Sequence, residues 1–231
     1  MKVLIGIATY QRVGKLKRLL KSIQNQTYKD YDVLVICDNK DEETYTSLYK
    51  EFPVMFRVMP EQSYVIGCWN AVHSFSGYDA HLTLCDDVEL LPDCLEKAVK
   101  EMQENFSDTD GVVGITQKCP GFENYTYQPT GQVLIGKGFI ERFKEVGYQV
   151  CCINYKQWYQ DNELFEYATR LGKFQLSKEA KLIHHHPCFY PSEMDHTHTL
   201  VRNNSVQIGD KQIYQKRLAR KLVWGESWEL V

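Results

Sequence analysis

No apolar run in this 231-residue sequence reaches the roughly 18–20 residues that a membrane span requires. The apolar start of the chain is interrupted at Gln11-Arg12, and no small-residue cleavage site follows, so a signal peptide is not expected. A strong charge is lacking too: the net charge is −3, whereas a protein built mainly to hold nucleic acid is basic. These absences predict a soluble, cytoplasmic, globular protein.

A disulfide framework is also missing, although the chain contains eight cysteines. Most of them lie inside apolar runs rather than in a small loop-rich scaffold, and Cys151-Cys152 lacks the CxxC spacing of redox pairs. We therefore expect reduced, buried thiols.

Short apolar runs alternate with amphipathic segments along the first half of the chain. Strands are predicted at Lys2–Ala8, Tyr31–Cys37, Val54–Met59, His81–Cys85 and Gly111–Thr116. Helices are predicted at Gly14–Gln26, Glu42–Glu51, Val65–Phe75 and Pro92–Asn105. This alternation predicts an α/β fold with a mostly parallel sheet flanked by helices on both faces.

The second half is less regular and shows no linker. Strands are predicted at Gln132–Ile135 and Ala180–His184, and helices at Gly138–Val146 and Trp158–Leu171. Beyond Pro187 the sequence is polar and irregular until a basic helix near Gln212–Val223. We expect one domain that carries an irregular C-terminal extension.

Three of the predicted strands end in polar residues. These ends are Thr9–Arg12, Asp38-Asn39 and Asp86-Asp87. Ligands of open α/β sheets bind at the carboxyl ends of the strands, so the three ends are expected to converge on one crevice.

Asp86-Asp87 is the sharpest of these features. Two neighbouring carboxylates repel each other unless a cation lies near them, and Mg²⁺ or Mn²⁺ prefers such oxygen ligands. A solvated acidic turn ahead of a helix that begins near Asp93 explains the same residues equally well.

Several segments together resemble one enzyme family. They are Ile5–Arg12, Leu19–Ile23, Gln26–Tyr28, Val33–Asp38, Gly67, Asn70, Leu84–Val88, Pro92–Leu95 and, more loosely, Asp161–Leu164 with Arg170 and Gly172. This set resembles the family 2 glycosyltransferases over roughly residues 2–187. The resemblance implies a GT-A fold, a Rossmann-like sheet that binds a nucleotide-diphosphate sugar, most often a UDP-sugar.

The resemblance also implies roles at the strand ends. Thr9 and Arg12 match a loop beside the nucleoside, Asp38 matches the aspartate that reads the base, and Asp86 lies on the ribose side. Asp87 matches the metal-binding aspartate of the DxD motif. Cys85 stands where the first aspartate of that motif would be.

Inverting sugar transfer is the chemistry that the resemblance implies. Asp161 matches the catalytic base that deprotonates the acceptor hydroxyl, next to Gln160 where a glutamate is common. Mn²⁺ or Mg²⁺ would stabilise the leaving diphosphate. Many GT-A enzymes complete the metal shell with a histidine after the catalytic helix, and His186, with His184 as the alternative, matches it.

Five histidines gather at positions 184, 185, 186, 196 and 198. Judged without the resemblance, the cluster fits either structural hydrogen bonding or a separate zinc site. On a strand, His184 and His186 share one face and His185 takes the other.

Two further segments carry open alternatives. Trp158 near Asp161 fits a platform on which an acceptor sugar stacks, and equally an ordinary packing residue. The basic helix fits either contact with anionic lipid, nucleic acid or a polyanionic acceptor, or a surface helix that packs Tyr214, Leu218 and Leu222.

The hypothesis from sequence is a glycosyltransferase with a GT-A domain at 1–187, comprising a donor half 1–110 and an acceptor half 111–187, and an extension at 188–231. One alternative is a nucleotidyltransferase, which the absence of a GxGxR-type loop disfavours. Another is a non-catalytic module that binds nucleotide or sugar, which Cys85 and Gln160 favour. The acceptor is open between a glycan, a lipid-linked sugar, a protein and a modified nucleobase.

Overall fold

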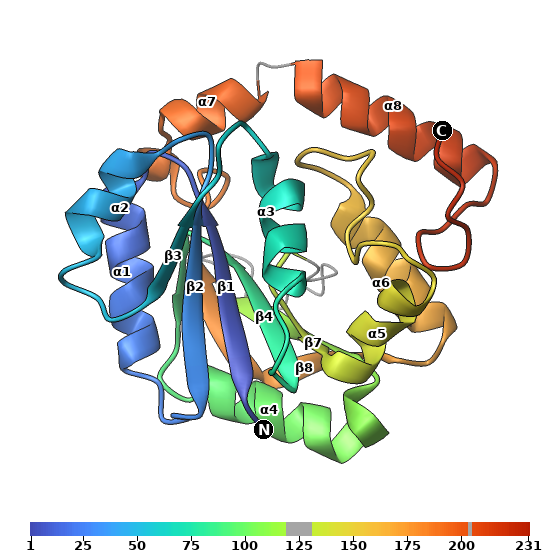
Figure 1. Cartoon of the computed structure of the whole chain (residues 1–231), viewed down its shortest axis with the longest axis horizontal. Coiled ribbons are helices and arrows are strands. Elements are labelled where there is room, and N and C mark those ends of the chain that lie inside the picture. The colour runs from blue at the N-terminus through green and yellow to red at the C-terminus, as the bar shows by residue number, and fades with distance from the viewer. Residues whose placement is uncertain (119–130, 203–204) are drawn as a thin grey trace.

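The computed structural model describes residues 1–118, 131–202 and 205–231. Its strands form one curved sheet in the order β3-β2-β1-β4-β7-β6-β8-β5 (Figure 1). The strands are β1 (Val3–Thr9), β2 (Tyr31–Cys37), β3 (Met55–Val58), β4 (Ala80–Cys85), β5 (Val88–Leu90), β6 (Val112–Lys118), β7 (Val133–Gly136) and β8 (Phe174–His184).

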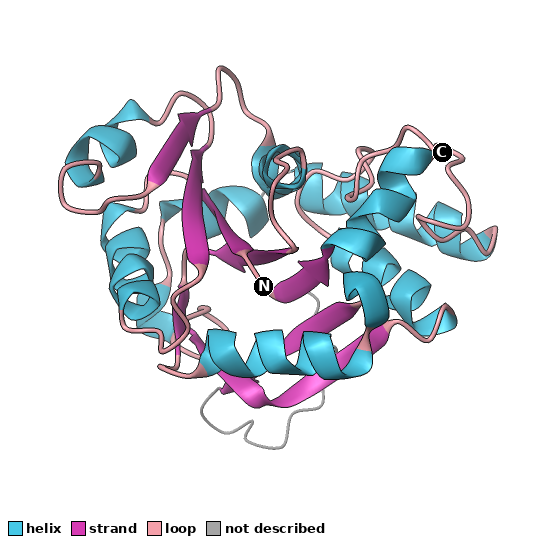
Figure 2. Ribbon diagram, turned by 60° about the horizontal axis from the view of Figure 1, so that its bottom comes forward, coloured by secondary structure: helices cyan, strands magenta, loops and turns pink. Residues whose placement is uncertain are grey.

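Helices cover both sides of this sheet (Figure 2). They are α1 (Val13–Gln24), α2 (Glu42–Leu48), α3 (Tyr64–His73), α4 (Cys94–Asn105), α5 (Lys137–Glu145), α6 (Gln160–Arg170), α7 (His196–Arg202) and α8 (Ser205–Ala219). Two short 3₁₀ helices lie at Ser107–Thr109 and Pro191–Glu193. The predicted α/β fold is confirmed.

Parallel pairing is concentrated in the first half of the chain. β1 pairs in parallel with β2 and β4, and β2 with β3. β7 is antiparallel to both β4 and β6, and β5 is antiparallel to β8. The strand β5 is too short for the sequence pattern to have predicted it.

The alternation of side chains explains why β1 reads as an almost continuous apolar run. Val3, Ile5 and Ile7 enter the core cluster that contains the apolar faces of α1 and α4. Leu4 points to the opposite face, into a cluster that contains Val72 of α3. Because both faces of the strand are covered, no position in it needs to be polar.

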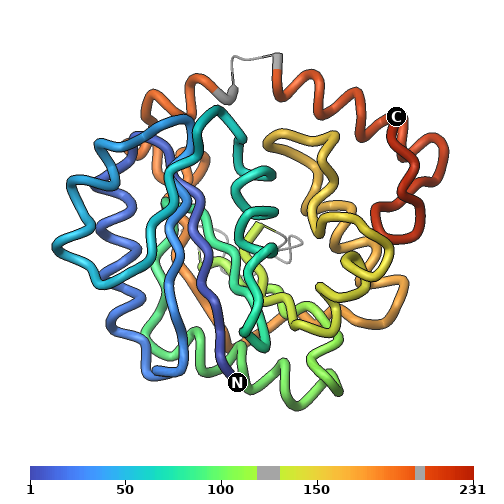
Figure 3. The backbone as a smooth tube through the Cα atoms, in the orientation of Figure 1, coloured from blue at the N-terminus to red at the C-terminus, as the bar shows by residue number. Residues whose placement is uncertain are grey.

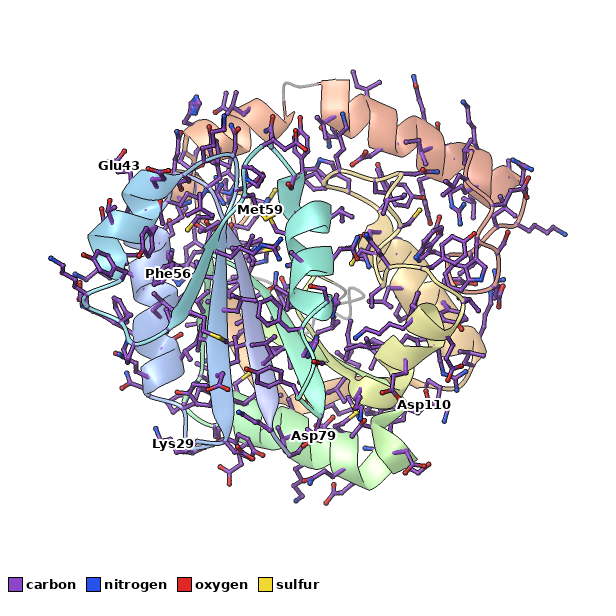
Figure 4. All side chains as sticks on the ribbon, in the orientation of Figure 1. Lys29, Glu43, Phe56, Met59, Asp79 and Asp110 are labelled. Atoms are coloured by element: carbon purple, nitrogen blue, oxygen red, sulfur yellow. The ribbon has the colours of Figure 1, made fainter. Side chains whose placement is uncertain are left out.

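The two ends of the sheet differ in character. Lys29 and Asp79 mark the end at which β2 and β4 begin, and Met59, which follows β3, marks the opposite end (Figure 4). At that carboxyl end lie α7, drawn orange, and the start of α8, drawn red, both of which contribute residues to the pocket described below (Figure 3). The C-terminal segment therefore lies where ligands of open α/β sheets bind.

This C-terminal segment differs from the sequence prediction in two respects. Residues 196–202 form α7, and α8 begins at Ser205, earlier than the predicted Gln212. The predicted apolar stripe of the basic helix is wrong, because Leu218 is 59% exposed while Asp210 and Arg217 are buried. The buried contacts of Asp210 and Arg217, together with the packing of Ile213 and Tyr214, orient α8.

Two further expectations can be compared with the structure. Among the helices of the described ranges, none is both long and apolar enough to cross a bilayer. The cysteines in those ranges are free, and all but Cys188 and the half-buried Cys85 are buried, as expected.

Candidate functional site

A pocket of about 270 Å³ lies at the carboxyl ends of β1, β2 and β4. It is lined by Ala8, Thr9, Tyr10, Arg12, Asp38, Asn39, Gln62, Tyr64, Val65, Cys68, Cys85, Asp86, Gln157, Thr197, Leu200 and Val206. The predicted convergence of the three polar strand ends is therefore confirmed. The charged members of the lining, Arg12, Asp38 and Asp86, were all singled out in the sequence.

Asp86 is held at the pocket wall by the loop that follows β1. Its Oδ2 accepts a hydrogen bond from Oγ1 of Thr9 at 2.8 Å, and its Oδ1 accepts one from Nη1 of Arg12 at 2.9 Å. Burial raises the pKa of Asp86, against the effect of the Arg12 charge. Arg12 is thus an internal counter-ion for a carboxylate that is 2% exposed.

Asp87 points away from Thr9 and toward the histidine cluster. Nε2 of His184 lies 3.2 Å from its Oδ1, and Nε2 of His198 lies 3.3 Å from its Oδ2. Burial alone would raise the pKa of Asp87, but contact with these two histidines and the nearby Arg12 charge hold it well below its usual value. Asp87 is therefore an ionised carboxylate enclosed by imidazoles.

The second ring nitrogen of each of these histidines also has an oxygen neighbour. Nδ1 of His184 lies 3.0 Å from Oε1 of Gln117, and Nδ1 of His198 lies 2.8 Å from Oδ1 of Asp195. Gln117 thus fixes the orientation of the His184 ring through Nδ1, so that Nε2 is the ring nitrogen that faces the Asp87 carboxylate.

The other histidines of the cluster occupy different positions. The ring of His186 packs edge-on against His184 and His198, with centroid separations of 5.3 and 5.5 Å, and its Nδ1 accepts a hydrogen bond from the amide of Cys188. His185 faces the other side and pairs with Glu89 at 3.1 Å. The alternation expected for a strand is confirmed.

Asp195 links the histidine cluster to α1 and starts α7. Its carboxylate lies 3.0 Å from Nη2 of Arg12 and 2.8 Å from Nζ of Lys15, and it accepts a hydrogen bond from the amide of His198. Burial opposes ionisation here, but these partners hold the pKa of Asp195 below its usual range. Arg12 consequently bridges the β4 end of the pocket and the C-terminal segment.

Asp38 lines the pocket and also holds the start of α3. Its Oδ1 accepts from the amide of Ser63 at 2.7 Å, and its Oδ2 accepts from the amide of Tyr64 at 2.9 Å. Burial raises the pKa of Asp38, and the two amides oppose that shift. Each oxygen keeps a second lone pair for a ligand.

The next two amides of α3 are bound by the segment 156–158, which we call the pocket loop. The amide of Val65 donates to Oε1 of Gln157 at 3.4 Å, and that of Ile66 donates to the carbonyl of Lys156 at 3.2 Å. Asp38 and the pocket loop thus share the N-terminal donors of α3, which would otherwise attract an anion.

Trp158 is the last residue of the pocket loop, and Asp161 follows it in the first turn of α6. Trp158 precedes α6, and its amide donates to the carboxylate of Asp210 at 2.9 Å. Asp161 is half-buried in the first turn of α6. Neither residue is among the described residues that line the pocket, whereas their neighbour Gln157 is.

Glu163, two residues after Asp161, has a structural role. It is 3% exposed and accepts hydrogen bonds from Tyr155 Oη at 2.6 Å, from Trp224 N at 2.7 Å and from Nε of Arg217 at 2.6 Å. The side chain of Arg217 is fully buried. This ion pair fastens α8 to α6.

Within the described parts of the chain, no three histidine, cysteine, aspartate or glutamate side chains are arranged to hold an ion by themselves. Asp87 nevertheless fits a divalent cation, because its buried Oδ1 makes no hydrogen bond although His184 faces it. Mg²⁺ is usually bound by one or two carboxylates together with substrate phosphates, so the residues present fit such an ion.

Sequence reasoning missed the part of the pocket that comes from distant segments. Gln62 and Tyr64 reach it from the turn before α3 and its first residue, and Gln157 reaches it from the pocket loop. Thr197, Leu200 and Val206 reach it from α7 and α8. Only the density of histidines hinted at these helices, since His198 was noticed but its contact with Asp87, 111 residues away, was not.

Two comparisons with known sequences both point to the glycosyltransferases. The family model described as "Glycosyl transferase family 2" matches residues 4–217. The uncharacterized glycosyltransferase YwdF of Bacillus subtilis (strain 168) is 31% identical over 105 residues, which are 45% of this chain and 39% of YwdF.

Two solved structures share the fold. TarS 1–349 of S. aureus in complex with UDP superposes with a TM-score of 0.60 at 14% identity, covering 79% of this chain and 60% of that one. The mannosyltransferase PcManGT from Pyrobaculum calidifontis, in complex with GDP-Man and Mn²⁺, gives 0.67 at 14% identity, covering 93% and 64%. The chain spans less than two thirds of the length of each of these three relatives.

Proposed function

Since this chain belongs to glycosyl transferase family 2, we propose that it transfers a sugar from a nucleotide-diphosphate donor to an acceptor hydroxyl group. The observation that carries the proposal is the pocket at the carboxyl ends of β1, β2 and β4, where Thr9, Asp38 and Asp86 share one wall. The fold that it shares with TarS in complex with UDP and with a mannosyltransferase in complex with GDP-Man supports this reading.

The donor is proposed to lie along this wall. The nucleoside would contact Thr9, Arg12 and Asp38, with a base N–H donating to a free lone pair of Asp38, and the ribose would lie near Asp86. UDP is our proposed nucleotide, since TarS was solved with UDP, while PcManGT, solved with GDP-Man, makes GDP the competing one.

Asp87 is the proposed ligand of Mn²⁺ or Mg²⁺. His186, or His184 in direct contact with Asp87, would supply a nitrogen ligand, and Gln117 fixes the His184 ring so that Nε2 faces Asp87. The bound ion would neutralise the charge on the leaving diphosphate. The Arg12 guanidinium meanwhile balances the Asp86 carboxylate.

Asp161 is proposed as the base that takes the proton of the acceptor hydroxyl, which then attacks the anomeric carbon from the side opposite the diphosphate. This attack inverts the configuration, and a positioned base contributes about 10²–10⁴ in rate. Trp158 is the proposed stacking surface for the acceptor. Trp158 ends the pocket loop and Asp161 lies in the first turn of α6, so the two residues flank the start of that helix.

The test is calorimetric titration of UDP, GDP and CMP, each with and without Mn²⁺, into the wild type and two matched variants. Asp87→Asn removes one charge at the proposed metal site. Asp93→Asn makes the same change at a partly exposed aspartate paired with Lys97. We expect Mn²⁺-dependent binding of one nucleotide that Asp87→Asn weakens at least tenfold and Asp93→Asn leaves unchanged.

Other outcomes separate the competing readings. Absence of binding by every nucleotide would overturn the donor site. Binding that is indifferent to Mn²⁺ and to Asp87→Asn would overturn the metal site alone. Nucleotide binding without hydrolysis or transfer from any of a panel of UDP- and GDP-sugars would identify a non-catalytic module.

A further inference from the structure

We propose that Asp210 of α8 is a positioning residue for the nucleotide pocket, because its buried carboxylate holds the pocket loop against α3. The nucleotide part of this inference rests on the proposed function; the ordering of the loop by Asp210 does not. Asp210 is not among the residues singled out in the sequence, and the basic helix predicted there began only after it, near Gln212.

The carboxylate of Asp210 binds the backbone of the whole pocket loop. It is 2% exposed, and its Oδ2 accepts from the amides of Lys156, Gln157 and Trp158 at 3.2, 2.8 and 2.9 Å. Its Oδ1 also lies 3.2 Å from the Lys156 amide. Three consecutive amides that converge on one point form a site for a negative charge, and Asp210 supplies that charge from another element.

The pocket loop, held by Asp210, in turn contacts the pocket and the start of α3. Gln157 lines the pocket and accepts the Val65 amide, and the carbonyl of Lys156 accepts the Ile66 amide. Nζ of Lys156 lies 5.5 Å from the ring centroid of Tyr64, which also lines the pocket. Loss of the Asp210 carboxylate would therefore release one side of the pocket and two donors at the start of α3.

The attachment of α8 to the rest of the molecule does not depend on Asp210. Arg217, two turns further along the helix, is fully buried against Glu163 of α6. Between them, Tyr214 stacks on Tyr159 with ring centroids 4.8 Å apart. These contacts hold α8 in place without Asp210. We therefore assign to the Asp210 carboxylate the role of holding the pocket loop.

The experiment compares three variants of the full chain. Asp210→Ala removes every acceptor. Asp210→Asn keeps one oxygen, which can still accept from Gln157 and Trp158. Lys211→Ala changes the exposed neighbour on the same helix. Amide hydrogen exchange at residues 65–66 and 156–158 measures the hold on the loop, and calorimetric titration of UDP and GDP with Mn²⁺ measures the consequence for binding.

We expect exchange at these amides to accelerate at least tenfold in Asp210→Ala and by a smaller factor in Asp210→Asn. The dissociation constant of the bound nucleotide should rise about tenfold in Asp210→Ala, and Lys211→Ala should match the wild type in both measurements. If Asp210→Ala does not fold, the same comparison is made with Asp210→Asn.

The experiment distinguishes a failure of the Asp210 inference from a failure of the proposed function. Unchanged exchange in the folded Asp210 variants would overturn the inference whatever the nucleotide does. Faster exchange with an unchanged dissociation constant would show that the loop does not position the nucleotide, and would overturn it too. A wild type that binds no nucleotide would refute the proposed function, and the exchange measurement would still decide whether Asp210 orders the loop.

Discussion

The buried pair of Arg217 and Glu163 allows a quantitative prediction about stability. Arg217→Met replaces the fully buried guanidinium by an apolar side chain and leaves the Glu163 carboxylate without its counter-charge. Glu163 would keep only the hydroxyl of Tyr155 and the amide of Trp224 as partners. We expect Arg217→Met to be among the most destabilising single substitutions on α8.

The size of the effect follows from the burial of both side chains. Removal of one partner of a buried ion pair costs about 3–5 kcal/mol, a large part of the ~5–15 kcal/mol that stabilises an ordinary domain. Adding Glu163→Gln removes the uncompensated charge and keeps an acceptor for Tyr155 or Trp224. The double variant should therefore be about 2 kcal/mol more stable than Arg217→Met alone.

Urea unfolding, followed by tryptophan fluorescence because Trp224 contacts the pair, measures these differences. Arg220→Met provides the matched control: Arg220, directly after the end of the same helix, pairs with the exposed Glu229, and such a surface salt bridge contributes at most about 1 kcal/mol. If Arg217→Met and Arg220→Met lose equal stability, or if the double variant is less stable than Arg217→Met, the argument from burial is refuted.

Three more predictions follow from other parts of the molecule. Gly6→Ala would place a Cβ 2.4 Å from Cγ1 of Val72, so we expect a loss of about 1–3 kcal/mol in thermal unfolding, and a wild-type melting temperature would contradict the close packing of α3 on β1. His73 and His81 are buried with their Nδ1 atoms 3.2 Å apart, and burial lowers the pKa of His81 from 6.5 to about 4. Because protonation favours the unfolded chain, the contribution of His81 to stability is full above pH 6.5 and should fall by about 3 kcal/mol down to pH 4, and His73, whose pKa burial also lowers, adds to that fall. Urea titrations at several pH values must detect this slope, and a His81→Gln variant should reduce it. Asp38→Asn should weaken nucleotide binding and speed amide exchange at the start of α3 together; an effect on only one of them would show that the two roles of this carboxylate are separable.

The sequence was sufficient for most strands of the sheet, though not for β5, and for one wall of the pocket. Strands such as β1 and β2 read directly from their apolar runs because both faces of each are covered, and β2 matches its predicted bounds, Tyr31–Cys37. The polar residues after them belong to the same short segments. Because the carboxyl ends of parallel strands lie at the same edge of a sheet, the sequence alone places Thr9, Asp38 and Asp86 at one site.

The opposite wall could not be read in this way. The pocket loop is held by Asp210, more than fifty residues later, and Asp87 is contacted by His198, more than a hundred residues later. A buried charged side chain that hydrogen-bonds to the backbone or to a ring far away in the sequence leaves no periodic pattern. On α8 the sequence even predicted an apolar stripe that the structure does not have. Basic residues there suggested a surface helix with an apolar stripe, whereas Leu218 is exposed and Arg217 is buried.

The 54 residues between Glu163 and Arg217 also have a consequence during biosynthesis. A ribosome that adds about 5–20 residues per second leaves roughly 3–11 seconds between the two residues. Throughout that interval the Glu163 carboxylate of α6 lacks its partner Arg217. The second half of the domain would therefore stay incompletely packed until α8 has been synthesised. A nascent chain stalled between these positions should therefore be the form that chaperones and proteases recognise most readily.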